Sequence, residues 1–241
     1  GHPRDVKDGF REEFLSFMPQ LDEEVRTELE HPITVSEIEG AIDDLALGKA
    51  PGPDGLGSAF YKAFKSTAAQ MLHRVLSEAY DQKRVPLSFT TSHIVLIPKS
   101  DDPEKRLLAG SYRPITLANV DYKIFMKALA RRLQSVITTL VGPHQTCGIK
   151  GRSIATNVHI ARTVLECCDA LGDRVAMMQL DLAKAFDRVS HEVLLCILEH
   201  SNVGCIITEG VRMAYTNCST RVIVNGELTE SLPIRSSVRQ G

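Results

Sequence analysis

The spacing of apolar residues first predicts helices along this chain. Thr34 and Glu37 have the spacing of a capping box, in which each side chain bonds to a backbone N–H at the start of a helix. An apolar stripe with helical spacing follows, and Gly48 stands where a helix commonly ends. The stripe consists of Ile38, Ala41, Ile42 and Leu45. This segment is therefore predicted to be an amphipathic helix that ends near Gly48.

Further helices are predicted by the same spacing and by their cap residues. Asp121 is expected to cap the longest of them and Ser153 the next. Gly142-Pro143 separates these two helices, because both residue types interrupt helical structure. The predicted helices start near Ser58, run from Asp121 to about Leu140, run from Ser153 to about Cys168, start at Ser190, and span about Ile206 to Tyr215.

Strands are fewer than helices. The apolar stretch Ile94–Ile97 runs into a polar loop that ends near Tyr112, which predicts a hairpin with basic residues at its tip. Arg221–Val224 and the turn signal Asn225-Gly226 predict a second hairpin that extends to Ile234. The fold class predicted from these patterns is α+β, helix-rich with a small antiparallel sheet.

A carboxylate stands where the most informative apolar run ends. Val175–Leu180 is predicted to be a buried strand, and Asp181 follows it directly. Burying a carboxylate costs free energy unless a metal ion or a partner neutralises it. Phosphoryl-transfer enzymes hold Mg²⁺ with carboxylates on rigid elements in this way. A helix cap, a surface turn or an ion pair with Lys184 or Arg188 would also explain Asp181.

Composition narrows the class of protein. The chain has 241 residues, of which 43% are hydrophobic and 24% charged, as is ordinary for a soluble globular protein. No apolar run approaches the roughly 18 residues that a membrane span needs, so no membrane partner is expected. The six cysteines include no Cys-x-x-Cys pair. This spacing favours buried intracellular thiols over a zinc site or a disulfide framework.

The net charge of −2 conceals two oppositely charged regions. Residues 1–48 contain 4 Lys and Arg against 13 Asp and Glu, whereas residues 83–152 contain 12 basic and 4 acidic residues. A basic block inside a folded region is expected where nucleic acid or nucleotide phosphates bind. A solvated basic face would have the same composition, so charge alone does not decide between them.

Six motifs then occur in a fixed order. They are Lys49–Gly55, Ile97–Lys99, Tyr112–Ile115, Gly151–Ser153, Asp181–Val189 and Val238–Gly241. In this order and spacing they resemble the reverse transcriptase of LINE-type (non-LTR) retrotransposons. The resemblance extends from about residue 34 to the last residue.

The resemblance implies a right-hand polymerase, of which this chain would hold the fingers and part of the palm. It implies RNA-directed DNA synthesis, with an RNA template, a DNA primer and deoxynucleoside triphosphates as partners. The boundaries it suggests are an acidic lead-in or linker at residues 1–33, fingers at 34–174, and a partial palm at 175–241. Such proteins act inside the cell, in nucleus and cytoplasm.

The resemblance also implies roles for individual residues. Asp181 matches the first catalytic aspartate, which binds both Mg²⁺ ions, and Leu182 would offer its backbone carbonyl to a metal. Phe186 matches a steric gate that leaves no room for a ribose 2′-hydroxyl, although it could equally be a core aromatic. Lys99 and Arg113 match the cations that hold the incoming triphosphate.

The remaining matches concern nucleic acid and the incoming nucleotide. Gln240 matches a residue that packs against the nucleotide and the template base. Lys49, Gly151 and Arg152 match segments that touch the template, and a scaffolding role explains them equally well. Asp187 is expected to cap a helix or form an ion pair rather than bind metal.

The chain departs from the family pattern at three places. Cys147-Gly148 replaces the usual Gly-Phe, and Ser237 stands where the family normally has glycine. The Ala-Asp-Asp box that supplies the other catalytic carboxylates would lie beyond Gly241. We therefore expect a fragment that lacks the rest of the palm and the thumb, and that is inactive by itself.

Three alternatives stay open at this stage. The chain could be a non-catalytic RNA-binding remnant that uses the basic region 83–152. It could be a degenerate relic without function. It could also be a group II intron-type reverse transcriptase, which shares many of these motifs.

Overall fold

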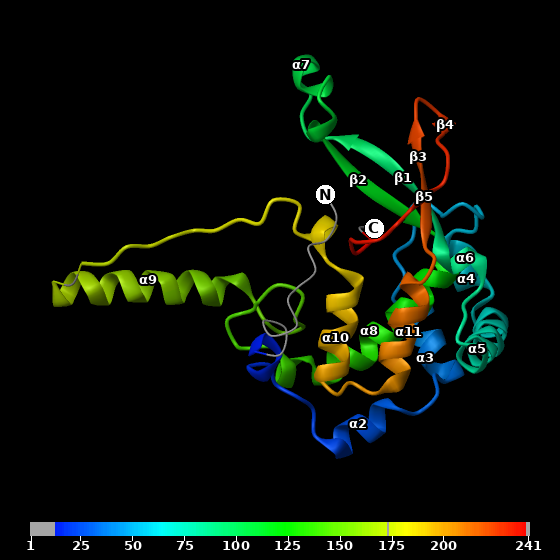
Figure 1. The fold of residues 1–241 in the computed structure, drawn as a ribbon, viewed down its shortest axis with the longest axis horizontal. Coiled ribbons are helices and arrows are strands. Elements are labelled where there is room, and N and C mark those ends of the chain that lie inside the picture. Colours follow the sequence, from blue (N-terminus) through cyan, green and yellow to red (C-terminus); the bar gives the residue numbers. More distant parts are fainter. Residues whose placement is uncertain (1–12, 173, 240–241) are drawn as a thin grey trace.

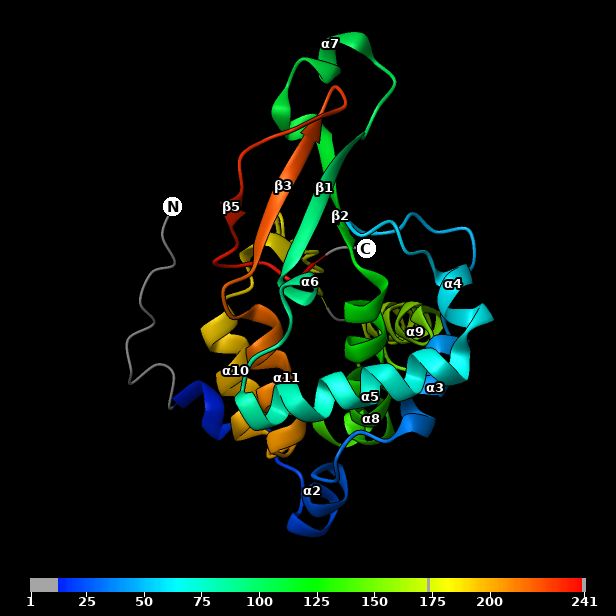
Figure 2. The ribbon, with the colours of Figure 1, turned by 90° about the vertical axis from the view of Figure 1, so that its right-hand side faces the viewer.

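A computed structural model describes residues 13–172 and 174–239. It shows a helical body from which a sheet rises at one end and a long helix, α9, projects at the side (Figures 1 and 2). The helices are α2 Glu23–Leu29, α3 Val35–Asp43, α4 Ser58–Ala63, α5 Lys65–Gln82, α6 Leu87–Thr90, α7 Pro103–Arg106, α8 Val120–Leu140, α9 Ile154–Leu171, α10 His191–His200 and α11 Cys205–Tyr215, with 3-10 turns η1 Ala109–Ser111 and η2 Phe186–Arg188.

The sheet has the strand order β2-β1-β3-β4, with β5 paired to β3. The strands are β1 Thr91–Pro98, β2 Tyr112–Ala118, β3 Ser219–Val224, β4 Glu227–Leu228 and β5 Leu232–Pro233. The predicted antiparallel arrangement holds for β1–β2, β3–β4 and β3–β5, while β1 and β3 pair in parallel. Two hairpins that are distant in sequence are thus joined edge to edge (Figure 2).

The core lies where α3, α5 and α11 pack around α8. Phe125 and Leu129 of α8 are almost completely buried. Gly210 lets α11 approach α8 closely, because a methyl group at this position would lie 2.7 Å from Leu129 Cδ1 and 2.6 Å from the Tyr80 hydroxyl oxygen. That hydroxyl donates to the carbonyl of Ile206 at 2.7 Å. Close backbone packing therefore fixes α11 on α8.

Arg132 of α8 ties the N-terminal segment to the core. Its guanidinium donates to both carboxylate oxygens of Glu37 and to the carbonyls of Leu29, His31 and Pro32. Only 10% of the Arg132 side chain is exposed. A nearly buried cation is tolerated because its donors are satisfied and a carboxylate neutralises it.

The structure confirms the predictions that rest on local signals. Thr34 and Glu37 form the expected capping box, and Ser153 caps α9 by accepting from Ala155 N–H. Asn225 and Gly226 both have positive φ, as a two-residue hairpin turn requires.

Two predicted helix ends are wrong in detail. Helix α3 ends at Asp43, not near Gly48, although Gly48 does have a positive φ of 71°. Asn119, not Asp121, is the N-cap residue of α8. The Asp121 carboxylate lies inside the first turn, where it accepts hydrogen bonds from Ser88 and Tyr122. Burial raises the pKa of Asp121 and outweighs these hydrogen bonds.

The predicted buried strand Val175–Leu180 is wrong. Described residues 174–182 form a segment without strand pairing, which runs back beside α9 toward α10 (Figure 1, yellow). Met178 and Leu180 are 81% and 82% exposed. A strand requires a neighbouring strand to pair with its backbone groups, and the described strands lie elsewhere, at the other end of the body.

The acidic N-terminal segment contributes to the body. Helix α2 forms there, and Leu21, Leu29 and Ile33 are buried in the same core as residues of α8 and α11. Its described part is therefore packed rather than a free linker. The boundary proposed at residue 174 falls between β1 and β3, although these two strands pair in one sheet. The division into domains stays a prediction.

Cysteine burial differs from the prediction. Cys218 is buried, but Cys147, Cys167 and Cys205 are exposed, so these three are not core thiols. As for membranes, no helix within the described ranges combines the length and apolar character needed for a span.

We expect Glu37→Gln to lower the free energy of unfolding by roughly 1–3 kcal/mol at pH 7, because Arg132 loses its counter-charge. Burial alone would raise the pKa of Glu37, but hydrogen bonds from Arg132 and Thr34 outweigh it and lower the pKa from 4.5 to about 2. A depressed pKa means that this stabilisation is complete above pH 4.5 and is lost as the pH falls toward 2.

Chemical denaturation of both proteins at pH 7 and pH 3 tests this expectation. The difference in unfolding free energy between wild type and Glu37→Gln should be smaller at pH 3 than at pH 7, because part of the Glu37 contribution is already lost at pH 3. Glu39→Gln on the same helix is the control, since no ion pair joins Glu39 to any described residue. Equal stability of wild type and Glu37→Gln at pH 7 would contradict the role given to this pair.

Candidate functional site

The β1–β2 hairpin carries two of the predicted site residues toward its tip. Ile97 of β1 is directly opposite Arg113 of β2, and Lys99 follows Ile97 by two residues. Lys99 lies one residue beyond the end of β1, so the alternation of side chains along a strand does not fix its direction. Both Lys99 and Arg113 are exposed, and the Lys99 ammonium donates to the carbonyl of Gly110 at 2.9 Å. The structure therefore exposes both cations near the same end of the hairpin.

The predicted metal ligand lies apart from that hairpin. Asp181 and Leu182 belong to the exposed extended segment that returns beside α9 (Figure 1). No group of three or more His, Cys, Asp or Glu residues within the described ranges could hold a metal ion. Asp181 alone does not make a complete metal site, so the described residues do not fit a bound pair of ions.

The predicted steric gate is held by the C-terminal tail, residues 234–239. Phe186 begins η2 and is 60% exposed, so it is not a core aromatic. Its carbonyl accepts from Val238 N–H at 3.0 Å, and the carbonyl of Val189 accepts from Ser237 N–H at 2.8 Å. The His191 ring also bonds to the Ser237 carbonyl. The tail therefore fixes the turn that presents Phe186.

Arg239 in turn fixes the tail to the body. Its guanidinium lies 4.3 Å from the centre of the Tyr122 ring of α8 and donates to the carbonyls of Phe89 at 2.8 Å and Ala214 at 3.5 Å. The Nε of Arg239 is buried and makes no hydrogen bond to the described residues. This residue was not identified from the sequence as a structural anchor. Gln240, which was singled out, lies outside the described residues, as does Gly241.

The proline- and glycine-rich loop that contains Lys49 docks on the start of α8. Asn119 accepts from Asp54 N–H at 3.2 Å and donates to the Ser88 carbonyl at 3.0 Å. A methyl group on Gly52 would lie 2.2 Å from Asn119 Oδ1, so only glycine fits there. Lys49 itself is exposed. Asn119 was missed because its contacts are distant in sequence.

Arg152 stabilises the loop between α8 and α9. Its guanidinium donates to the carbonyls of Val141, Gly142 and Gln145, which closes the loop between α8 and α9. Gly151 has a φ of 82°, which favours glycine at this turn. These contacts support a scaffolding role for both residues, and their predicted contact with nucleic acid stays a prediction.

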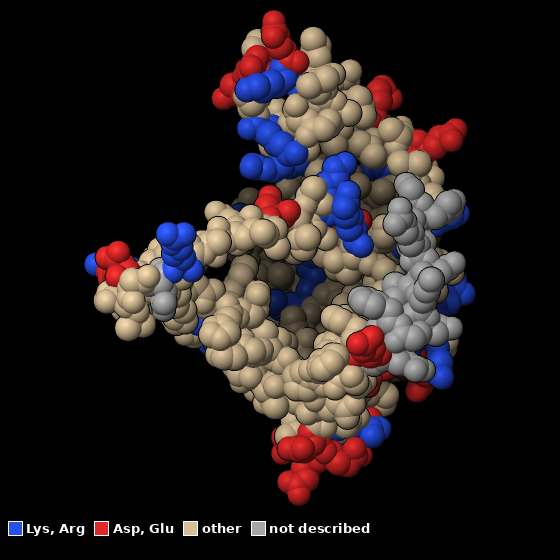
Figure 3. Space-filling view, turned by 60° about the vertical axis from the view of Figure 1, so that its left-hand side comes forward, with Lys and Arg blue, Asp and Glu red and all other residues tan. Residues whose placement is uncertain are grey.

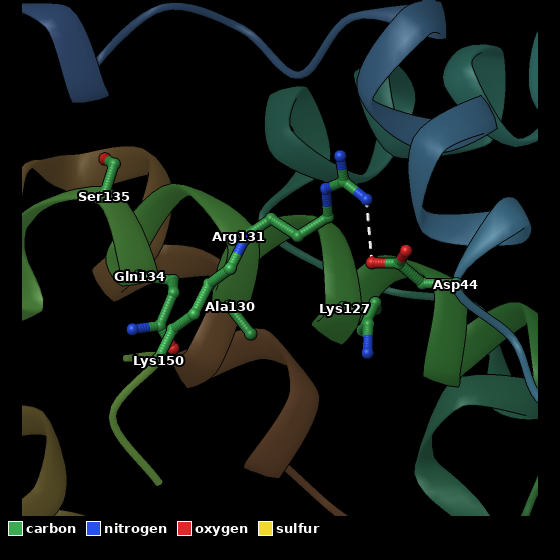
Figure 4. A pocket seen from close by; sticks show the side chains of 7 residues that line it. All are labelled: Asp44, Lys127, Ala130, Arg131, Gln134, Ser135 and Lys150. Atoms are coloured by element: carbon green, nitrogen blue, oxygen red, sulfur yellow. Dashed lines mark hydrogen bonds and ion pairs between the residues drawn. The ribbon is translucent and has the colours of Figure 1, made fainter. Parts of the chain in front are cut away.

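Charge is distributed unevenly over the surface. On the face shown in Figure 3, basic side chains gather below the tip of the β1–β2 hairpin and at the bottom of a central hollow. Acidic side chains gather at the opposite end of the molecule and also at the very tip, above the basic group. The acidic and basic regions of the sequence nevertheless meet at α8, where Arg131 pairs with Asp44 (Figure 4) and Arg132 with Glu37.

Comparison with known proteins assigns the chain to a family. Residues 97–241, more than half of the chain, match the family described as reverse transcriptase (RNA-dependent DNA polymerase). The chain belongs to this reverse transcriptase family. The predicted fold class, polymerase fingers with part of a palm, is consistent with this membership.

The relatives are proteins of non-LTR retrotransposons. The chain is 35% identical to "Transposon TX1 uncharacterized 149 kDa protein" of Xenopus laevis over 95% of this chain and 17% of that protein. It is 31% identical to "Probable RNA-directed DNA polymerase from transposon BS" of Drosophila melanogaster over 68% of this chain and 18% of that protein. It is 26% identical to "Retrovirus-related Pol polyprotein from type-1 retrotransposable element R2" of Bradysia coprophila over 87% of this chain and 23% of that protein.

These shares mean that the chain spans about a fifth of the length of these relatives. Membership of the family confirms the resemblance to LINE-type reverse transcriptases. The family implies an RNA template, a primer and nucleotide substrates, and its members generally use divalent metals.

We expect Ser237→Gly to raise the free energy of unfolding by about 0.5–1 kcal/mol. Ser237 has a φ of 94°, which strains any residue with a Cβ atom by about 1–3 kcal/mol. The free energy gained by releasing this strain exceeds the entropic cost of introducing glycine, which is about 0.5–1 kcal/mol. Thermal unfolding measures the effect. The neighbouring change Ser236→Gly is the control and should destabilise, because Ser236 lacks a positive φ.

Proposed function

We propose that this chain is part of an RNA-directed DNA polymerase that adds deoxynucleotides to a DNA primer on an RNA template, with Mg²⁺ as the metal. The observation that carries the proposal is that the β1–β2 hairpin, within the span that matches the family, exposes both Lys99 and Arg113. An exposed arginine can bind a phosphate with two parallel hydrogen bonds, and a lysine beside it adds a point charge.

The proposal also assigns roles to Phe186 and Asp181, which precede α10 in the chain. Phe186 would limit space around the sugar of the nucleotide, and its exposure leaves the ring available for such a contact. Asp181 would contribute one ligand to Mg²⁺, a hard cation that prefers oxygen. We assign the other ligands to parts of the polymerase outside the described residues.

We predict that Arg113→Gln weakens binding of dTTP about tenfold, because the bidentate charge-assisted contact is lost. Isothermal titration calorimetry with Mg²⁺ and an RNA-template–DNA-primer duplex measures this. Lys105→Gln is the matched control: Lys105 is an exposed cation at the tip of the same hairpin, paired with Asp102 at 3.6 Å. Equal dTTP affinity of wild type and Arg113→Gln, or no binding by wild type, would refute this role of the hairpin.

We also predict that residues 1–241 alone do not extend a primer. Two-metal chemistry needs several carboxylates around ions about 4 Å apart, and Asp181 is a single exposed carboxylate. A primer-extension assay with a retroviral reverse transcriptase as positive control tests this. Extension by the wild-type chain that disappears in Asp181→Asn would overturn the predicted inactivity and support the role of Asp181.

A non-catalytic RNA-binding role is the second candidate. It would use the basic region 83–152, from which Lys123, Lys127 and Arg131 line two cavities along α8. RNA binding that is unchanged by Asp181→Asn, in a chain without polymerase activity, would support this role. Loss of RNA binding in Asp181→Asn would contradict it.

A further inference from the structure

Phe186 is held in place through its backbone. Its side chain is 60% exposed, and it begins the short 3-10 turn η2, which follows the unpaired segment 174–182. A side chain this exposed has few neighbours to pack against. The position of its ring therefore depends on the backbone of the turn.

Two consecutive residues of the C-terminal tail bind this turn. The Val238 N–H donates to the Phe186 carbonyl at 3.0 Å, and the Ser237 N–H donates to the Val189 carbonyl at 2.8 Å. The tail reaches these residues beside the start of α10 (Figure 1). A shift of the tail would therefore move the turn that carries Phe186.

His191, the first residue of α10, connects the tail to the helical body. Its Nε2 lies 2.8 Å from the carbonyl oxygen of Ser237. Because a carbonyl oxygen can only accept, this nitrogen carries the proton and donates. The same ring packs against the Tyr215 ring of α11, with 4.4 Å between the ring centres. Since α11 is packed closely on α8, the imidazole fixes the tail relative to the body.

The Ser237 carbonyl is a point at which such a bond has a large effect. Ser237 has a φ of 94°, a conformation that is strained for a residue with a Cβ atom. Rotation of this backbone toward an unstrained conformation would turn the carbonyl away from His191. It would also shift the Val238 N–H that holds the Phe186 carbonyl. The hydrogen bond from His191 opposes this rotation.

Other contacts hold the tail further from Phe186. The Ile234 N–H donates to the Cys218 carbonyl at 2.9 Å, and the Arg239 guanidinium lies over the Tyr122 ring. These contacts fix the two ends of the tail. The hydrogen bond from His191 acts between them, where the tail passes the turn.

We propose that His191 is a positioning residue for nucleotide selection, which holds the Ser237 carbonyl and thereby sets how closely the Phe186 ring approaches the sugar. This inference rests on the proposed function, in which Phe186 limits the space around that sugar. A displacement of about 1 Å is enough to weaken a contact of this kind severely. Without the bond from His191, the turn can move and ribonucleotides are excluded less strongly.

Isothermal titration calorimetry with dATP and ATP tests the proposal, since these nucleotides differ only in the 2′-hydroxyl. The whole chain is titrated with Mg²⁺ and an RNA-template–DNA-primer duplex whose next template base is uridine. We expect the wild type to bind dATP about tenfold more tightly than ATP. His191→Ala should reduce this ratio about threefold to tenfold, the effect of one lost hydrogen bond. His191→Gln should restore the ratio to within about twofold of wild type, because its amide can donate to the same carbonyl.

Two further variants separate positioning from a general loss of stability. His200→Ala is the matched control, because His200 lies at the other end of α10, where its ring bonds to Gln20. This variant should leave the ratio of dATP to ATP affinity unchanged. Phe186→Ala removes the ring that excludes the hydroxyl, so the ratio should fall to about one. Adding His191→Ala to Phe186→Ala should then change the ratio no further.

The outcomes of the titrations are distinct. No binding of dATP by the wild type, or equal affinity for dATP and ATP, would refute the proposed role of Phe186 and this inference with it. A preference for dATP that Phe186→Ala removes and His191→Ala leaves intact would overturn the role of His191 alone. An equal effect of His191→Ala with and without the Phe186 ring would also overturn it.

Hydrogen exchange tests the structural step without a nucleotide. We expect the Ser237 and Val238 amides to exchange about threefold to tenfold faster in His191→Ala than in the wild type, because the tail opens more often. Both amides should exchange at close to the wild-type rate in His191→Gln and in His200→Ala. Unchanged exchange of these amides in His191→Ala would overturn the proposal.

Discussion

The hydrogen-bond network around Arg132 is the constraint on which the helical body depends. One guanidinium holds Glu37 and the carbonyls of Leu29, His31 and Pro32, so α2, the start of α3 and α8 cannot move independently. Because helix α8 is fixed in this way, its start and its middle can position other segments. Asn119 at its start holds the Pro- and Gly-rich loop, and the close approach at Gly210 sets α11 against its middle. The hairpin and the tail are built on elements that α8 positions.

Elements determined by interactions within a few residues were predictable from the sequence. The capping box at Thr34, the cap at Ser153 and the Asn225-Gly226 turn each satisfy backbone groups locally, so their residue types suffice to identify them. The exposure of Lys99 and Arg113 toward the tip of the β1–β2 hairpin was also foreseen in outline, from two strands separated by a polar loop. The chemical roles of these residues came from resemblance to a family rather than from spacing.

Features determined by distant partners were not predictable. Val175–Leu180 has the composition of a buried strand, but a strand forms only beside another, and the segment is exposed. Arg152 has the charge expected of a nucleic-acid contact, yet the carbonyls that surround it could be known only from the fold. Arg239 likewise depends on the Tyr122 ring and the carbonyl of Phe89, about 120 and 150 residues away in the sequence.

The places where this chain breaks local rules lie beside its candidate sites. Ser237 has a backbone conformation that favours glycine, and it lies in the tail that holds Phe186. Lys123 and Lys127 repel each other beside an apolar cavity. A sequence selected only for stability would place glycine at the first position and a carboxylate near the second. Departures from local consistency are expected at functional sites, since a ligand or partner there restores the balance. The row of lysines therefore favours the RNA-binding candidate independently of the family to which the chain belongs.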